Sequence, residues 1–211
     1  MYFLSRELFF PPVSYASPEG IIAIGGDLSP ERLLLAYSNG IFPWFEDDEP
    51  ILWWSPPQRM VLFFCDLKIS KSMRNILNRN IFTVTFNTAF RDVITNCRDI
   101  KRDGQPGTWI TDDMTEAYCK LHEMGKAKSV EVWHDGILVG GLYGVDMGHI
   151  FCGESMFSLM PNASKVAFIA LAKKLDQENY RVLDCQVHND HLESLGAREI
   201  LRVDFLAMLK G

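Results

Sequence analysis

Several features that would point directly to an activity are missing from this chain of 211 residues. Its five cysteines form no Cys-x-x-Cys pair, so we expect reduced thiols rather than a disulfide framework or a zinc ribbon. No apolar run approaches the roughly 20 residues of a membrane span, and the start of the chain lacks the basic region of a signal peptide. Phosphate-binding motifs such as Gly-x-Gly-x-x-Gly are also missing. We therefore expect a cytoplasmic protein without a membrane segment, a metal or a cofactor.

Two short motifs begin like catalytic signatures but are incomplete. Residues 153–157 start like the Gly-x-Ser-x-Gly elbow of serine hydrolases, but Phe157 replaces the second glycine. His188 and His191 supply two imidazoles, for which we expect capping and surface roles rather than zinc binding. Serine hydrolase and zinc chemistry are therefore disfavoured.

Charge is unevenly distributed along the chain. The formal net charge is −6, which on its own disfavours a nucleic-acid partner. Residues 1–60, however, hold three Arg against eight Asp and Glu, while the rest of the chain holds 18 basic against 19 acidic residues. The larger part can therefore carry a local basic face, and the total charge does not exclude an anionic partner.

Turn-forming residues divide the chain close to residue 60. Residues 1–59 are rich in Pro and Gly and predict a small N-terminal subdomain. Its clearest helix has Ser29 as the N-cap, Pro30 in the first turn and Gly40 after its end. Residues 60–211 are more regular and predict a second, larger domain.

The strongest fold signal is an antiparallel meander followed by a helix and further strands. Hairpin turns at residues 135–136 and 147–148 separate the first three strands. The segments expected to build this sheet are strands at 129–133, 137–145, 149–156, 181–187 and 200–205, with a helix at 163–175. The expected fold class is α+β: a small irregular N-terminal subdomain followed by a GNAT-like mixed sheet with flanking helices.

The connection between the meander and the expected crossover helix, residues 158–164, contains no glycine. Acetyl-CoA transferases of this fold normally have a glycine-rich loop here, because side chains hinder close approach of the backbone to a pyrophosphate. The fold therefore indicates acyl transfer, and the loop indicates a donor other than CoA. An acyl-CoA N-acyltransferase remains the rival enzyme.

Polar residues on two expected strands are candidates for a site. Asp184 and Gln186 are expected on one face of their strand, with Cys185 pointing away, because strand side chains alternate. Glu154 falls near the end of the third meander strand, where a widened sheet would open a cleft. Two alternatives stay open: an edge strand that presents polar side chains to water, and a solvated carboxylate at Glu154.

Two tryptophans are candidates for ligand contacts. Most tryptophans belong to the core, and this is the alternative for Trp44 and Trp109. Trp109, however, stands between a loop containing Gly and Pro and the cap of an expected helix, where a ring is often presented to a ligand. Indole is also a platform on which a nucleobase stacks.

Taken together, these segments resemble one family over nearly the whole chain, the leucyl/phenylalanyl-tRNA–protein transferases. The motifs that carry the resemblance lie at residues 25–30, 40–45, 53–56, 107–110, 129–133, 151–158, 184–187, 189–191 and 194–197. So many long motifs in one order make the resemblance highly specific.

The resemblance implies an enzyme that moves Leu or Phe, and weakly Met, from Leu-tRNA or Phe-tRNA to proteins whose N-terminal residue is Arg or Lys. The new N-terminal residue is a degradation signal of the N-end rule. The resemblance also implies a two-domain, cytoplasmic protein without a metal, and we expect a monomer. A binding module without catalysis is the alternative from outside the enzymes, and the intact pair of Asp184 and Gln186 argues against it.

Matching motif positions then assigns roles to individual residues. Asp184 and Gln186 match the catalytic pair, and we expect Gln186 to orient the attacking amine while Asp184 orients Gln186. A strong base is unnecessary, because roughly a tenth of an α-amine is unprotonated at pH 7. The residues assigned to substrate binding are Glu154 at the acceptor, Trp44, Trp109 and Tyr118 near the terminal adenosine, Phe151 and Leu142 in the amino-acid pocket, and Ser155.

Basic residues near an expected helix at 70–77 are candidates for contacts with the tRNA backbone. Lys68, Lys71 and Arg74 recur at a spacing of three, which places them on one side of a helix. A solvated amphipathic helix is the alternative interpretation.

Overall fold

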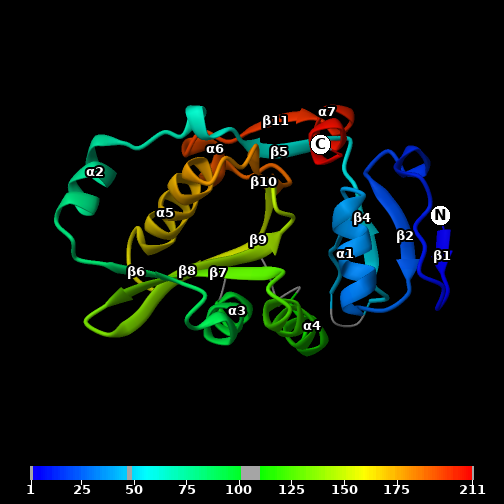
Figure 1. The fold of residues 1–211 in the computed structure, drawn as a ribbon, viewed down its shortest axis with the longest axis horizontal. Coiled ribbons are helices and arrows are strands. Elements are labelled where there is room, and N and C mark those ends of the chain that lie inside the picture. The colour runs from blue at the N-terminus through cyan, green and yellow to red at the C-terminus, as the bar shows by residue number, and fades with distance from the viewer. Residues whose placement is uncertain (1, 47–48, 101–109, 211) are drawn as a thin grey trace.

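The computed structural model describes residues 2–46, 49–100 and 110–210, and it contains two β-sheets (Figure 1). The N-terminal sheet consists of β1 (Tyr2–Leu4), β2 (Ile21–Gly25), β3 (Phe42–Pro43) and β4 (Leu52–Trp54), in the order β1-β2-β4-β3. Helix α1 (Pro30–Ser38) begins where the sequence predicts, and the Ser29 hydroxyl accepts the Arg32 backbone N–H at 3.4 Å.

The larger sheet has the order β11-β5-β10-β9-β8-β7-β6. Its strands are β5 (Gln58–Leu62), β6 (Thr83–Phe86), β7 (Ala127–His134), β8 (Ile137–Asp146), β9 (Ile150–Ser158), β10 (Val182–Gln186) and β11 (Arg198–Leu201). Neighbouring strands are antiparallel except for β9 and β10, which are parallel because helix α5 (Ala163–Gln177) crosses over between them. This meander, crossover helix and further strands confirm the expected α+β, GNAT-like arrangement.

Helices cover both faces of the larger sheet. Helix α5 lies on one face of β7, β8 and β9, while α3 (Phe90–Asp99) and α4 (Asp112–Glu123) lie on the other (Figure 1). The remaining helices are α2 (Lys71–Asn78), α6 (Asp190–Ser194) and α7 (Arg202–Leu209), with 3-10 turns η1 (Val13–Tyr15) and η2 (Phe64–Asp66). Among the described residues, no helix is long and apolar enough to cross a membrane.

One apolar core links the N-terminal sheet to the larger sheet. Trp53 of β4, Tyr37 of α1, Tyr118 of α4 and Tyr143 of β8 belong to a single buried cluster. A second cluster lies on the α5 side of the larger sheet. The domain division near residue 60 stays a prediction, and β5, the first strand of the larger sheet, begins at Gln58.

The strand expected at residues 200–205 is partly wrong. Strand β11 ends at Leu201, and α7 begins at the next residue. Phe205 and Leu209 are buried four residues apart while Val203 is exposed, which is the spacing of one helix face. The apolar run is too short for periodicity to separate a strand from a helix.

A buried carboxylate holds the start of α3 against the sheet. Glu131 of β7 accepts hydrogen bonds from the hydroxyls of Ser129 at 2.5 Å, Thr85 at 2.7 Å and Thr88 at 2.9 Å. It also accepts the backbone N–H groups of Thr88 at 3.3 Å and Ala89 at 3.4 Å. Burial alone raises the pKa of Glu131, but these hydrogen bonds outweigh it and hold the pKa below its usual value.

We expect Glu131→Gln to lower the free energy of unfolding by about 1–3 kcal/mol at pH 7, because an amide NH₂ cannot accept these hydrogen bonds. Since the folded pKa of Glu131 is lowered, the carboxylate's contribution is complete above the ordinary pKa of about 4.3 and is lost as the pH falls through the folded pKa. Urea unfolding between pH 7 and pH 3 measures both effects. Glu116→Gln, which removes an exposed ion pair with Arg91, is the control, and equal destabilisation of the two variants would contradict the prediction.

Candidate active site

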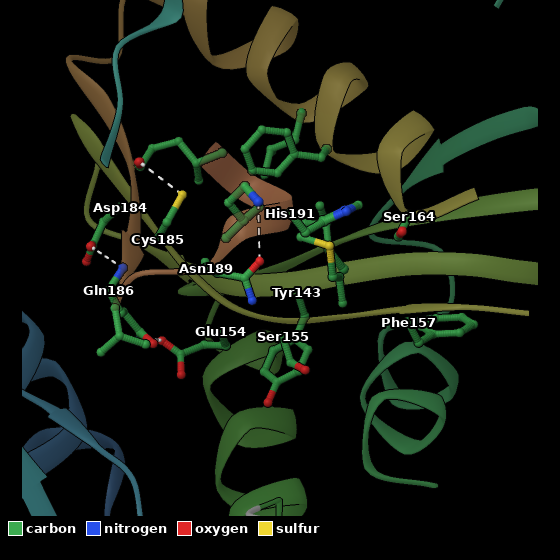
Figure 2. Close-up of a pocket in the computed structure, with 18 of the residues that line it drawn as sticks. Tyr143, Glu154, Ser155, Phe157, Ser164, Asp184, Cys185, Gln186, Asn189 and His191 are labelled. Atoms are coloured by element: carbon green, nitrogen blue, oxygen red, sulfur yellow. Dashed lines mark hydrogen bonds between the residues drawn. The ribbon is translucent and has the colours of Figure 1, made fainter. Parts of the chain in front are cut away.

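The pairing of β9 with β10 ends early and leaves a pocket. Strand β10 pairs with β9 only from Val182 to Asp184, whereas β9 continues beside β8 as far as Ser158. A cavity of about 520 Å³ lies here, lined by residues 153–158, the end of β10 and one side of α5 (Figure 2). A cleft was expected beside Glu154 near the end of this strand; the cavity does lie beside Glu154, but Glu154 stands in the middle of β9.

Gln186, the last residue of β10, has an unusual backbone conformation. Its φ is +65°, while the other described non-glycine residues with positive φ are all Asn or Asp. The register with β5 shifts between Asp184 and Gln186, which is a β-bulge. Asp184 and Gln186 were expected on one face of the strand because strand side chains alternate, and the bulge interrupts this alternation. Cys185, which was expected to point away, is also among the residues that line the cavity. The Gln186 backbone N–H donates a hydrogen bond to Asp184 Oδ1 at 2.9 Å, and this bond joins the two residues.

Asp184 is one half of a buried ion pair. Its side chain is 0% exposed, and Arg59 of β5 donates from Nε to Oδ1 at 2.8 Å and from Nη2 to Oδ2 at 2.7 Å. Strand β10 lies between β5 and β9, so the edge-strand alternative is wrong. With both oxygens engaged, the carboxylate is better placed to hold its neighbours than to take a proton.

Glu154 is the second acid of the site, and it is 8% exposed, so the solvated-carboxylate alternative is wrong. Oε1 accepts a hydrogen bond from Gln186 Nε2 at 2.7 Å (Figure 2). Oε2 accepts one from the Tyr118 hydroxyl at 3.2 Å. The Tyr118 hydroxyl is also hydrogen-bonded to that of Tyr37 on α1. Burial raises the pKa of Glu154 to about 7, and the nearby charge of Asp184 acts in the same direction.

Part of the cavity wall is apolar. The apolar side chains that line it include Leu142, Met156, Phe168, Leu171 and Leu183. These residues come from β8, β9, α5 and β10, which lie together only in the folded chain.

The remaining residues predicted to bind substrate fall into three groups. Trp44 and Ser155 line the cavity, and Trp44 is 38% exposed. Tyr118 and Phe151 are fully buried and do not line it; Tyr118 supports Glu154, and Phe151 shares a buried cluster with Leu142. Trp109 lies outside the described residues.

The three predicted tRNA-contacting residues are exposed, and none of them lines the cavity. Helix α2 begins at Lys71 after its cap, Ser70, so Lys68 precedes the helix and only Lys71 and Arg74 lie on it. Figure 1 shows α2 at the opposite end of the molecule from the N-terminal sheet.

The glycine-free loop before α5 uses its polar groups internally. The Ser158 hydroxyl accepts the Ser164 backbone N–H at 3.2 Å and donates to the Met160 carbonyl at 2.8 Å. The Ala163 N–H is also taken, by the Met160 carbonyl at 3.1 Å. Because the first two amides of the helix have partners, they are poorly placed to hold a pyrophosphate.

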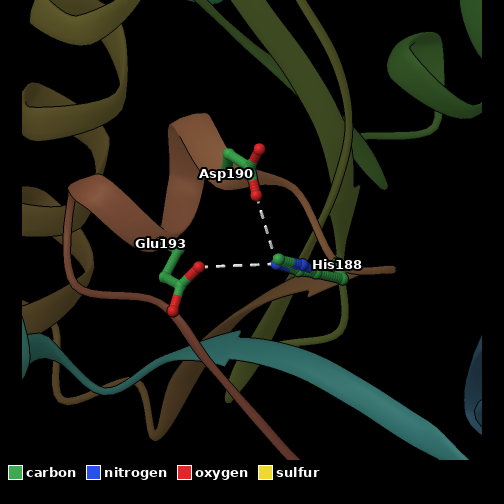
Figure 3. A group of neighbouring side chains, drawn as sticks. All are labelled: His188, Asp190 and Glu193. Atoms are coloured by element: carbon green, nitrogen blue, oxygen red, sulfur yellow. Dashed lines mark ion pairs between the residues drawn. The ribbon is translucent and has the colours of Figure 1, made fainter.

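A separate polar cluster of three exposed residues follows β10 in the chain (Figure 3). His188 Nε2 is 3.5 Å from Asp190 Oδ1 and 3.4 Å from Glu193 Oε2, and all three residues are exposed. These contacts are surface ion pairs when the imidazole is protonated, in agreement with the surface role expected for His188. His191 instead is partly buried and lines the cavity.

Two residues of this site were not expected from the sequence, Arg59 and Tyr37. Arg59 immediately precedes the buried strand residues 60–62, and Tyr37 lies on the same buried helix face as Leu33 and Ala36. The only local signal was a polar group at a position where the surrounding pattern predicts burial.

Comparison with known proteins gives consistent matches. The family model described as leucyl/phenylalanyl-tRNA protein transferase matches residues 61–210, and the model of its N-terminal domain matches residues 26–57. A leucyl/phenylalanyl-tRNA–protein transferase of Flavobacterium johnsoniae is 67% identical over 210 residues, covering 100% of this chain and 99% of that protein. The protein of the same name from Flavobacterium psychrophilum is 65% identical and covers 100% of both chains.

Among solved structures, FemX matches with a TM-score of 0.50 and 11% identity, covering 86% of this chain and 71% of that chain. This likeness concerns the fold alone. Together with the sequence matches, it defines the class of this protein, an aminoacyltransferase built on a GNAT-like mixed sheet. More particularly, the chain belongs to the leucyl/phenylalanyl-tRNA protein transferase family.

The Glu154 carboxyl is expected to titrate near pH 7 in the free protein. Tyr118→Phe should move this titration to higher pH, because it removes a hydrogen bond that favours the ionised form. Carbon-13 NMR of labelled glutamate carboxyls measures the change, with Glu154→Gln identifying the signal. Tyr15→Phe, at an exposed tyrosine, is the control. A Glu154 titration near pH 4 in the wild type would contradict the prediction.

Proposed function

We propose that this protein transfers leucine or phenylalanine, and weakly methionine, from Leu-tRNA or Phe-tRNA to the α-amine of proteins that begin with Arg or Lys. The observation that best supports this proposal is the combination, in one cavity, of an apolar wall with the hydrogen-bonded pair of Gln186 and Glu154. The transferred residue would then mark the acceptor for degradation under the N-end rule. We place this reaction in the cytoplasm and assign it to a monomer.

The reaction needs alignment more than proton chemistry. The acceptor nitrogen forms a bond to the ester carbonyl carbon, the bond from that carbon to the ribose oxygen breaks, and the amine's proton passes to the ribose oxygen. Because Gln186 Nε2 donates to Glu154, the Gln186 carboxamide oxygen is the atom that accepts a hydrogen bond from the amine and directs its lone pair. Asp184 holds the Gln186 backbone.

The apolar part of the cavity is proposed to take the donor side chain. Leu and Phe are both unbranched at Cβ, and burying either side chain contributes roughly 1.5–3 kcal/mol. Leu142 lines this wall and contributes to its apolar character. Since one methylene discriminates by only about 1–3 kcal/mol, weak transfer of Met is expected.

Glu154 is proposed to bind the cationic side chain of the acceptor. Its carboxylate borders the cavity, and a hydrogen bond to a charged group contributes about 1.5–3 kcal/mol. Trp44, which is exposed at the cavity, is proposed to contact the terminal adenosine of the tRNA together with Trp109. Tyr118 is proposed to act at the same site through its hydrogen bond to Glu154. Ser155 lines the donor side of the same cavity, with Phe151 behind the wall.

Contacts with the rest of the tRNA are assigned to Lys68, Lys71 and Arg74. All three are exposed, and most of the excess of acidic over basic residues lies in the first 60 positions, which hold three Arg against eight Asp and Glu. Local basic groups can thus meet phosphates although the net charge is −6.

The proposed reaction is tested by mixing the protein with tRNA carrying labelled Phe and a peptide that begins with Arg. Label should enter the peptide, and labelled acetyl-CoA should give no acylated product, because the loop before α5 has its amides already paired. Mass spectrometry of the peptide locates the added residue at the α-amine. Absence of transfer, with correctly folded protein and intact charged tRNA, would reject the proposed function.

Glu154→Gln should reduce kcat/KM for a peptide beginning with Arg by roughly 10- to 100-fold, because it removes the charge that binds the guanidinium. For the same peptide beginning with citrulline, a neutral analogue of Arg, the substitution should reduce kcat/KM far less. In the wild type, the preference for Arg over citrulline should weaken as the pH falls below about 7, where Glu154 takes up a proton. If the variant keeps the full preference for Arg, the role assigned to Glu154 is wrong.

A further inference from the structure

Arg59 reaches the site from outside the residues assigned to it. Its side chain is 2% exposed and lies on β5, next to β10 in the sheet. Two parallel hydrogen bonds, of 2.8 and 2.7 Å, join its guanidinium to the two oxygens of Asp184. Such a paired contact fixes the orientation of the carboxylate as well as balancing its charge.

Arg59 is itself held from three sides. Nη1 donates to the Gly40 carbonyl at 3.3 Å, and the guanidinium lies 4.7 Å from the ring centres of both Phe42 and Phe205. Gly40 has φ +70°, a backbone conformation that favours glycine, and a Cβ there would also come to 2.5 Å from the end of the Leu206 side chain. Arg59 thus joins the N-terminal segment, α7 and the strand that carries Asp184.

The next contact joins Asp184 to Gln186, the residue proposed to align the amine. Asp184 Oδ1, which Arg59 also contacts, accepts the Gln186 backbone N–H at 2.9 Å. Gln186 has φ +65°, a conformation that residues other than Gly, Asn and Asp adopt mainly when their surroundings hold them there. From this conformation its carboxamide reaches Glu154 at 2.7 Å.

We propose that Arg59 is a positioning residue of the transferase, which acts through Asp184 to hold Gln186 in its left-handed conformation. This inference rests on the proposed function for its effect on the reaction, although its structural part is independent of the substrate. A lysine at this position keeps the charge but cannot make the two parallel hydrogen bonds, so the orientation of Asp184 is lost while the charge balance remains.

Arg59→Lys is therefore the informative variant, and Arg32→Lys is its matched control. Arg32 is equally buried and forms an ion pair with Asp27, but its partners belong to the N-terminal subdomain. Both substitutions should lower the thermal stability, whereas only Arg59→Lys should disturb Gln186.

The first measurement uses the protein without substrates. Hydrogen exchange of peptides covering residues 183–189 should be faster in Arg59→Lys than in the wild type, because the Gln186 N–H loses its fixed acceptor. Arg32→Lys should leave exchange in this segment unchanged. Unchanged exchange in Arg59→Lys, or equal acceleration in both variants, would overturn the inference whether or not the protein transfers an amino acid.

The second measurement follows single-turnover transfer of Phe to a peptide beginning with Arg. Misplacement of Gln186 in Arg59→Lys should lower the rate at saturation by roughly 100-fold. The half-saturation constant for charged tRNA should change far less. Asp184→Asn combined with Arg59→Lys should be no slower than the slower single variant, because both act through one contact. A wild-type rate in Arg59→Lys would overturn the inference. So would a double variant in which the rate losses of the two single variants multiply.

If Arg59→Lys does not fold, Phe205→Leu provides the test, because it keeps the ion pair and removes one of the two rings that hold the guanidinium. It should produce the same changes in exchange and rate in smaller degree. Wild-type exchange and rate in this variant would overturn the inference. Failure of the wild type itself to transfer Phe would reject the proposed function, and the exchange measurement would still decide the role of Arg59.

Discussion

A negative charge in the interior of the larger sheet is the feature on which the surrounding structure depends. Asp184 is completely buried, and a buried carboxylate that loses its partner costs about 3–5 kcal/mol. Strand β5 must therefore bring Arg59 to it, and Arg59 in turn takes up the Gly40 carbonyl and two aromatic rings. The cavity opens just beyond Asp184, where the pairing of β9 with β10 ends.

The buried glutamates show how hydrogen-bond partners decide whether an acid is charged. Glu131 receives hydrogen bonds from three hydroxyls and two backbone amides, and its pKa is lowered. Glu154 receives hydrogen bonds from Gln186 and Tyr118, burial prevails, and its pKa is raised to about 7. Glu131 therefore stays ionised at neutral pH and stabilises the fold, while Glu154, beside a cavity, can change charge at neutral pH.

The reaction proposed for this site has a donor that is already activated. An ester and an amine react when they are held close together and aligned, and an amide side chain such as Gln186 can align an amine without removing a proton. The contacts around Gln186 are hydrogen bonds that restrict its position rather than groups that activate it. This is why the apolar wall and the polar pair together support transfer between bound substrates.

The sequence by itself determined the elements that depend on local patterns: the capped helix α1, the meander from β7 to β9, the crossover helix α5, and the family motifs that mark Asp184, Gln186 and Glu154. Capping, alternation and helical spacing are short-range properties, so they can be read along the chain. The tertiary structure alone decided that Asp184 is buried against Arg59, 125 positions away, that Gln186 leaves the regular strand, and that residues 202–209 form a helix. Burial and ion pairing depend on which strands become neighbours, and no local pattern contains that information.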